Sequence, residues 1–131
     1  LALQRASAYF SQLTAGHYVR VLIPLGQREL LVERHDGERL LPSQLSRGTL
    51  EQLLLAMRLA LVEEYSSRVA LPLVMDDILV NFDPRRLALA VQTLIQLSRQ
   101  RQVFFLTCHP HVEAAFRQAL AGEDWACLVM G

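Results

Sequence analysis

The sequence contains no lysine: all thirteen basic residues are arginines, and thirteen acidic residues balance them. The phosphate-binding loop GxxxxGK[ST] requires a lysine, and no segment of the chain matches it. The zero net charge provides no overall field that would attract nucleic acid or an anionic membrane. A complete phosphate loop of this kind is therefore excluded from these residues, and net charge says nothing about partners.

Cysteines and long apolar runs are also scarce. The two cysteines, Cys108 and Cys127, form no CxxC pair and are too few for a disulfide framework, so we expect a reducing, cytoplasmic compartment. No apolar run is long enough to cross a bilayer. The chain starts at Leu1 without Met or a signal pattern, so we expect a piece of a longer or processed protein. Its 131 residues predict one domain.

The amino-terminal part predicts one helix before a small antiparallel region. Apolar residues recur at helical spacing from Leu3 to Leu13, and Gly16 suits a left-handed cap behind that helix. We expect residues 1–15 to be an amphipathic helix or the end of a coiled coil, and residues 16–131 to form one lobe. The antiparallel region is predicted from strand-like segments at 18–23, 29–34 and 39–41, with the turn-forming dipeptide Asp36-Gly37 before the last.

Two uniformly apolar segments, 73–75 and 103–106, predict parallel strands buried on both faces. The segment between them has helical spacing, with Asp83 as N-cap and Pro84 at the first helical position. This makes a strand–helix–strand unit, so the predicted fold class is α/β, with parallel strands flanked by helices. Further elements are expected as a long helix from Leu50 to Leu61, a helix from Val112 to Leu120 and a last strand at 125–130.

Four short motifs follow one another along the chain, and two of them have a plain structural explanation. The first, Leu45-Ser46-Arg47-Gly48-Thr49, precedes a helix, where backbone N–H groups and the helix dipole bind anionic oxygens. A serine-capped helix start is the commoner reason for such a pattern. The third motif, Asn81-Phe82-Asp83, is by itself a turn and a helix cap.

The second and fourth motifs place acids and a histidine at strand ends. Asp76 and Asp77 follow the first apolar strand, at the edge where open α/β sheets bind ligands. One carboxylate can hold Mg²⁺ through water, and the other can orient a water for attack on phosphate. His109 ends the second strand, near Asp76, where it can hydrogen-bond a phosphate, although a lone histidine is usually structural. His109 and His111 have no clear third ligand for a metal site.

In this order, the motifs resemble the signature, Walker B, D-loop and switch-histidine motifs of ABC/SMC-type ATPase heads. They are most similar to those of the YhaN-type coiled-coil ATPases, which are related to SMC, RecF and SbcC. The resemblance implies the C-terminal half of a P-loop NTPase head, without its N-terminal Walker A lobe. Departures from the family pattern are Arg47 for glycine, Thr49 for glutamine and Asp77 for glutamate.

The resemblance also assigns roles in a site where two heads enclose ATP and Mg²⁺. Asp76 would serve Mg²⁺ through water, Asp77 and His109 would be catalytic, and Ser46 and Gly48 would contact ATP held by a second head. The other ATP-binding residues implied are Arg47, Thr49, Asn81 and Asp83.

The implied function is ATP hydrolysis by a complete protein in DNA repair or processing, with DNA as a further partner, no membrane, and no activity in this chain alone. Two alternatives stay open. One is a noncatalytic dimerisation lobe, because lysine is missing and Asp77 replaces a glutamate. The other is an unrelated metal-dependent hydrolase using Asp76, Asp77 and His109, which leaves the first motif unexplained.

Overall fold

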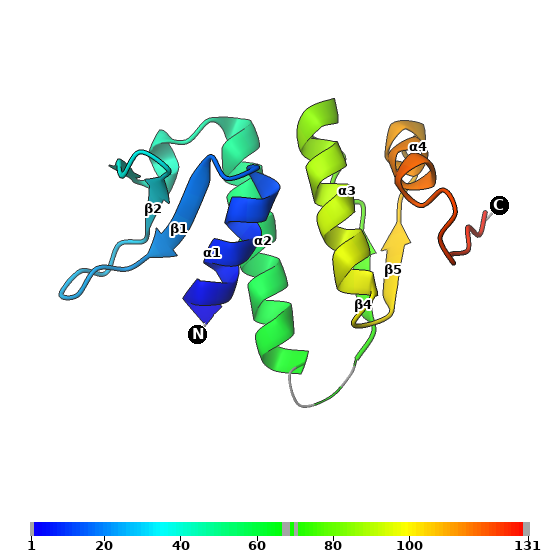
Figure 1. The fold of residues 1–131 in the computed structure, drawn as a ribbon, viewed down its shortest axis with the longest axis horizontal. Helices are drawn as coiled ribbons and strands as arrows, with labels where there is room; N and C mark the ends of the chain where they lie inside the picture. Colours follow the sequence, from blue (N-terminus) through cyan, green and yellow to red (C-terminus); the bar gives the residue numbers. More distant parts are fainter. Residues whose placement is uncertain (1, 67–68, 70, 130–131) are drawn as a thin grey trace.

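The computed structural model describes residues 2–66, 69 and 71–129, in which two small sheets lie on either side of a group of helices (Figure 1). In chain order the elements are α1 (Ala2–Leu13), β1 (Tyr18–Leu22), β2 (Leu31–Arg34), β3 (Arg39–Leu40), the 3-10 helix η1 (Pro42–Gln44), α2 (Arg47–Ser66), β4 (Leu73–Asp76), α3 (Pro84–Ser98), β5 (Val103–Leu106) and α4 (Pro110–Ala119). The last strand predicted at 125–130 is wrong for residues 125–129, which form no strand, and Met130 lies outside the described residues. Among the described helices, none has both the length and the apolar character needed to cross a membrane.

Two residues with left-handed backbone, Ala15 and Gly16, follow the carboxyl end of α1. The Gly16 N–H donates to the Ser11 carbonyl at 2.8 Å, and the Ala15 N–H donates to the Gln12 carbonyl at 3.2 Å. This pair of bonds satisfies carbonyls that the helix leaves without partners. Gly16 has φ 81°, as expected for a left-handed cap, but Ala15 before it is also left-handed, with φ 53°.

The antiparallel sheet has the order β1-β2-β3, and it confirms the region predicted before the first motif. Val21 of β1 lies opposite Val32 of β2, and both side chains are buried in the same core as Phe10 of α1. Gly37 closes the turn between β2 and β3, with φ 89° and its N–H bonded to the Arg34 carbonyl at 2.9 Å. The sheet and α1 thus form one side of the core.

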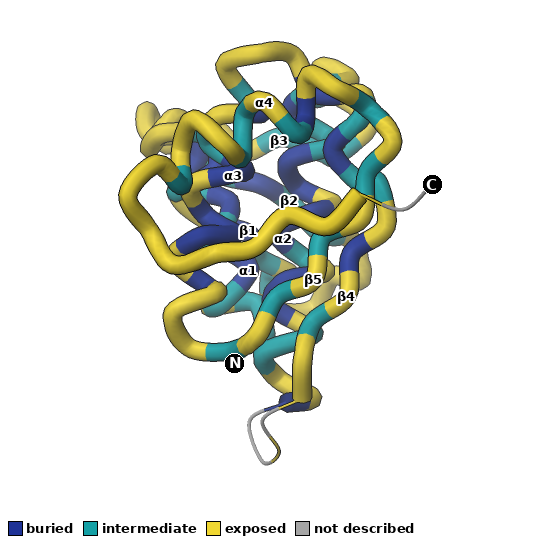
Figure 2. The backbone as a smooth tube through the Cα atoms, turned by 90° about the vertical axis from the view of Figure 1, so that its right-hand side faces the viewer, coloured by how far each residue is buried: buried dark blue, intermediate teal, exposed yellow. Residues whose placement is uncertain are grey.

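The second sheet consists of β4 and β5 in parallel, as the apolar runs predicted. Successive side chains alternate between its two faces. Met75 is buried, and Phe105 packs against Phe116 of α4 with ring centroids 4.7 Å apart. On the other face Val74 is 61% exposed and Phe104 is 48% exposed, and this alternation runs along both strands in Figure 2. The prediction that both faces are buried is wrong within the described residues, because helices cover only one of them.

Gln52 is a buried polar residue that joins three helices. Its side chain, only 3% exposed, donates to the carbonyl of Leu13 at the end of α1 at 2.7 Å. Its side-chain oxygen accepts a longer bond of 3.4 Å from Nε of Arg86 on α3. Buried polar groups cost free energy unless they are hydrogen-bonded, so these partners make Gln52 compatible with the core.

We expect Gln52→Met to lower the free energy of unfolding by about 1–3 kcal/mol, because the buried Leu13 carbonyl would lose its donor. Urea denaturation of the chain measures this change. Gln92→Met, at an exposed position of α3, is the matched control and should change stability little. Equal losses in the two variants would contradict a structural role for the Gln52 side chain.

Candidate functional site

The four sequence motifs gather at one end of the molecule. The amino ends of α2 and α3 and the carboxyl ends of β4 and β5 all point toward this end (Figure 1). Ligands of open α/β sheets bind where the strands end, and helix amino ends attract anions. At this end the side chains form two groups, one around α2 and α3 and the other around β4 and β5.

The first group begins at Ser46, which caps α2. Its Oγ accepts a bond from the Thr49 N–H at 3.3 Å and donates to the Thr49 hydroxyl at 2.9 Å. Ser46 and Arg47 are exposed, whereas Thr49 is buried. The helix cap foreseen for this serine is therefore present, and the loop ends at Ser46, so that Arg47, Gly48 and Thr49 form the first helical turn.

Arg86 of α3 lies directly over Gly48. A Cβ atom placed on Gly48 would come within 2.7 Å of the Arg86 guanidinium carbon, so a side chain there would displace the arginine. The Arg86 guanidinium also contacts the hydroxyl of Thr49 at 3.4 Å. Sequence reasoning missed Arg86, although an aspartate and an arginine three residues apart at the start of a predicted helix indicate an ion pair.

Asp83 connects the D-loop motif to the same arginine. Its Oδ1 accepts the Arg86 N–H at 2.9 Å, and its other oxygen forms an ion pair with the Arg86 guanidinium. The backbone hydrogen bond from Arg86 is the main reason that the pKa of Asp83 is lowered. Asn81 is exposed and Phe82 is buried, so Phe82 anchors this turn. Asp83 is therefore the predicted cap of α3 and also the partner of the arginine that covers Gly48.

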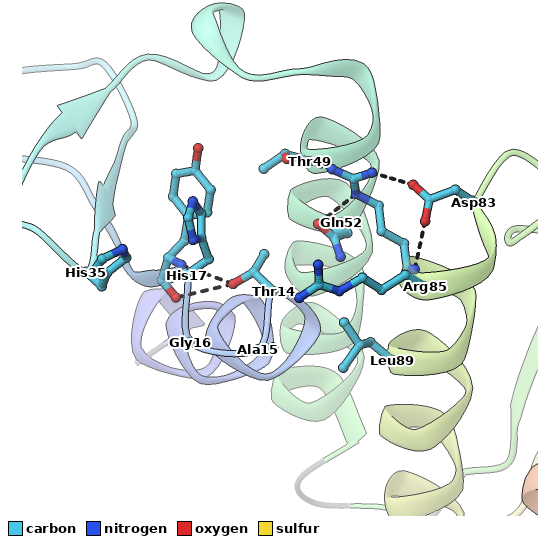
Figure 3. Close-up of a pocket in the computed structure, with 12 residues that line it drawn as sticks. Thr14, Ala15, Gly16, His17, His35, Thr49, Gln52, Asp83, Arg85 and Leu89 are labelled. Carbon is cyan, nitrogen blue, oxygen red and sulfur yellow. Dashed lines mark hydrogen bonds and ion pairs between the residues drawn. The ribbon is translucent and has the colours of Figure 1, made fainter.

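A cleft of about 460 Å³ opens beside this group, between the end of α1, α2 and α3. Figure 3 shows Arg85 extending from α3 across this cleft toward the residues that follow α1. His17 and His35 line the opposite wall, with ring centroids 5.2 Å apart. The cleft is polar and carries the basic side chains Arg85 and Arg86 at its α3 wall.

Asp77 is the centre of the second group. Its backbone is left-handed, with φ 53°, and its N–H donates to the Leu106 carbonyl at 2.8 Å, which continues the pairing of β4 with β5. The carboxylate accepts a bond from Thr107 Oγ1 at 2.7 Å, from His109 Nδ1 at 2.9 Å and from Cys108 Sγ at 3.3 Å. The Thr107 bond is the main cause of a lowered pKa at Asp77, while the same carboxylate raises the pKa of the Cys108 thiol.

Asp76 lies at the end of β4, and its exposed side chain forms no hydrogen bond or ion pair with any described residue. The structure pairs His109 with Asp77, where the sequence had placed it near Asp76. Asp76 and Asp77 line a second cleft of about 820 Å³, together with Cys108 and the segment after α4. No role was predicted for Thr107 or Cys108 from the sequence, because nothing in their spacing showed that Asp77 turns toward them.

The two groups lie at the same end of the fold but form separate networks. Within the part of the chain that the structure describes, no hydrogen bond or ion pair joins Asp83 or Arg86 to Asp77 or His109. The structure thus brings Ser46, Gly48 and Thr49 together with Asp83, and Asp77 together with His109.

No protein-family model matches the chain. The chain is 36% identical over 118 residues to the uncharacterized protein YhaN of Bacillus subtilis (strain 168). That alignment covers 89% of this chain but 12% of YhaN, so the chain spans a small part of this relative.

Solved structures of SMC heads share the fold. The SMC head domain from Thermotoga maritima has a TM-score of 0.68 and 19% identity, covering 87% of this chain and 40% of that one. A structure from work on ATP-driven dimerization and DNA-stimulated activation of SMC ATPases has a TM-score of 0.64 and 17% identity, covering 86% of this chain and 73% of that one. An SMC head bound to the C-winged helix domain of ScpA has a TM-score of 0.65 and 16% identity, covering 87% of this chain and 36% of that one.

The solved structures have low sequence identity to the chain, so they establish the fold alone. The similarity in sequence is to YhaN. The chain is therefore similar in sequence to a part of YhaN and has the α/β fold of part of the solved SMC heads, so the resemblance and the fold class predicted from its motifs are confirmed.

Proposed function

We propose that this chain is the C-terminal lobe of an SMC/RecF-like head that binds and hydrolyses ATP once an N-terminal Walker A lobe completes it. The observation that carries the proposal is the pairing of Asp77 with Thr107 and His109 at the ends of two parallel strands, beside the exposed Asp76. Parallel strand ends are where such folds hold nucleotides. The proposal assigns one group of residues to ATP of the same head and the other to ATP of a second head.

In the same head, Asp76 would hold Mg²⁺ through water, since its carboxylate is exposed. Asp77 and His109 would act on the terminal phosphate and the attacking water. With Nδ1 of His109 donating to Asp77, Nε2 of that ring can donate to a phosphate oxygen when the ring is cationic. Three donors already occupy the Asp77 carboxylate, which has about four acceptor positions, so one remains for a water.

Toward a second head, the first turn of α2 would receive the terminal phosphate of that head's ATP. The helix dipole and the free N–H groups of this turn favour an anion, and Ser46 adds a hydroxyl. Arg86 lies over Gly48, so an arriving phosphate would meet this guanidinium as well as the helix. Arg47, Thr49, Asn81 and Asp83 complete the surface proposed to meet the second head.

The open face of the second sheet supports a missing lobe as partner. Val74, Phe104 and Leu106 are exposed apolar side chains on the two-stranded parallel sheet. Parallel sheets are normally covered on both faces, and exposed apolar patches mark interaction surfaces. An N-terminal lobe that supplies the phosphate loop would cover these side chains. DNA is proposed as a further partner on the analogy of the SMC proteins alone.

A noncatalytic dimerisation lobe is the second candidate. Asp77 is one methylene shorter than the glutamate that its position usually holds, and its carboxylate is largely engaged by Thr107, Cys108 and His109. A carboxylate held in this way can serve to orient His109 without activating water. The experiments on Asp77 and on the completed protein below separate the two candidates.

We expect the chain alone to release no phosphate from Mg²⁺–ATP, because it contains no lysine for a phosphate loop. Adding an N-terminal lobe with that loop should restore hydrolysis, measured as phosphate release. Turnover by the purified chain alone would disprove the proposal that this chain is one half of the ATP site. The turnover must be lost in Asp77→Asn, which excludes a contaminating ATPase.

In the completed protein, we expect Asp77→Asn to reduce turnover by roughly 10²–10⁴, the usual contribution of a general base, while ATP binding and head dimerisation persist. Steady-state phosphate release and analytical ultracentrifugation with ATP measure the two effects. Asp36→Asn removes the same charge from the exposed turn between β2 and β3 and should leave turnover unchanged. Full activity in Asp77→Asn would favour the noncatalytic lobe.

We expect Ser46→Arg to leave ATP binding by a single head intact but to prevent ATP-dependent dimerisation, because the larger side chain would block the amino end of α2. Nucleotide affinity and sedimentation with ATP test the two parts. Ser43→Arg, at an exposed residue of η1, adds the same side chain outside the helix cap and is the matched control. Normal dimerisation of Ser46→Arg would show that this turn does not face the second head.

A further inference from the structure

Three different metal-binding atoms meet at the ends of β4 and β5. They are a carboxylate oxygen of Asp77, the sulfur of Cys108 and Nδ1 of His109, and all lie within 4.8 Å of one another. The separations are 3.3 Å from oxygen to sulfur, 2.9 Å from oxygen to nitrogen and 3.5 Å from sulfur to nitrogen. The ATPase roles proposed above give Cys108 no function, so this triangle of atoms is not explained by them.

The triangle has nearly the size that one tetrahedral ion requires. Metal–ligand distances of about 2.0–2.3 Å place neighbouring donors about 3.3–3.6 Å apart. The two distances to sulfur lie within that range, and only the oxygen–nitrogen distance is shorter, by about 0.4 Å. One ion could therefore contact all three atoms after a small movement of the His109 or Asp77 side chain.

The surrounding structure holds these ligands in place. Thr107 donates its hydroxyl to the second oxygen of Asp77 at 2.7 Å and accepts the His109 N–H at 3.1 Å, so one side chain orients two ligands. The left-handed backbone of Asp77 and its bond to Leu106 turn the carboxylate toward β5. Second-shell bonds of this kind fix ligand geometry in known metal sites.

The ligand types identify the ion. Sulfur and imidazole together with one carboxylate suit Zn²⁺ and similar transition metals, whereas Mg²⁺ prefers oxygen ligands alone. Three protein ligands with a free fourth position are typical of zinc sites that keep a water. Cys108 is exposed and lies on the wall of the cleft of about 820 Å³, so an ion can reach it from solvent.

We propose that Asp77, Cys108 and His109 form a binding site for a zinc-class ion, whose fourth ligand is water. Binding forms three metal–ligand bonds: the Cys108 thiol releases its proton to solvent, and the neutral His109 ring binds through Nδ1 in the tautomer that carries its proton on Nε2. The site is separate from the Mg²⁺ ligand Asp76 and does not require ATP. One consequence rests on the proposed function: an ion here would occupy Asp77 and His109 and so inhibit turnover in the completed protein.

The site is tested by titrating the reduced chain with Co²⁺. We expect one equivalent to produce the visible bands of tetrahedral cobalt and a near-ultraviolet thiolate-to-cobalt band, which Zn²⁺ but not excess Mg²⁺ abolishes. Cys108→Ser should remove the thiolate band, and Thr107→Val should weaken binding about 10–100-fold. Circular dichroism confirms that each variant is folded.

Cys127→Ser is the matched control, because Cys127 is the other exposed cysteine and its sulfur contacts Arg117 and Glu113. It should bind Co²⁺ with an unchanged band. A thiolate band that survives Cys108→Ser, or one that disappears in Cys127→Ser, would overturn the site. So would a His109→Asn variant that binds with unchanged affinity.

A second measurement keeps this inference distinct from the proposed function. In the completed protein Zn²⁺ should inhibit ATP turnover, and Cys108→Ser should be inhibited much less, when each protein is compared with its own turnover in the absence of Zn²⁺. Cobalt binding by a protein that hydrolyses no ATP would refute the ATPase role and leave the metal site standing. Turnover without any cobalt band would refute the metal site alone.

Discussion

The carboxylate of Asp77 accepts hydrogen bonds from Thr107 and His109, and it thereby connects the residue after β4 to the segment after β5. The left-handed backbone at Asp77 makes this possible, since it turns the side chain away from the direction that the strand would give it. Asp76 is exposed because strand alternation places its side chain on the same open face as Val74. Two adjacent acids of similar chemistry thus have different surroundings, and their proposed roles differ for that reason.

A second network joins the amino ends of α2 and α3 through Arg86. This arginine pairs with Asp83 and lies over Gly48, while Gln52 connects it to the end of α1. The end of α1 and the first turn of α2 are therefore linked by the contacts of two side chains, Gln52 and Arg86. In the proposed SMC-like head, the first turn of α2 would meet a second head. Arg86 and Gln52 hold this turn, and the same two residues join the helices to one another.

The two networks lie at one end of the fold. The open face of β4 and β5 is the surface on which the proposed N-terminal lobe would pack. Exposed Val74 and Phe104 lie on a parallel sheet that helices cover on one side only. The chain also spans a small part of YhaN. Both facts support the proposed lobe, in which another polypeptide segment would supply the phosphate loop because this chain contains no lysine.

The sequence by itself determined the α/β class, most helices and strands, and the order of the four motifs, because these depend on periodicity, caps and residue type within short segments. The cap at Asp83 and the turn at Gly37 are local features of this kind. Tertiary structure alone decided that His109 pairs with Asp77, that Arg86 covers Gly48 and that one face of the parallel sheet stays open. Those outcomes depend on backbone direction at single residues and on contacts between segments more than thirty residues apart, which no local pattern contains.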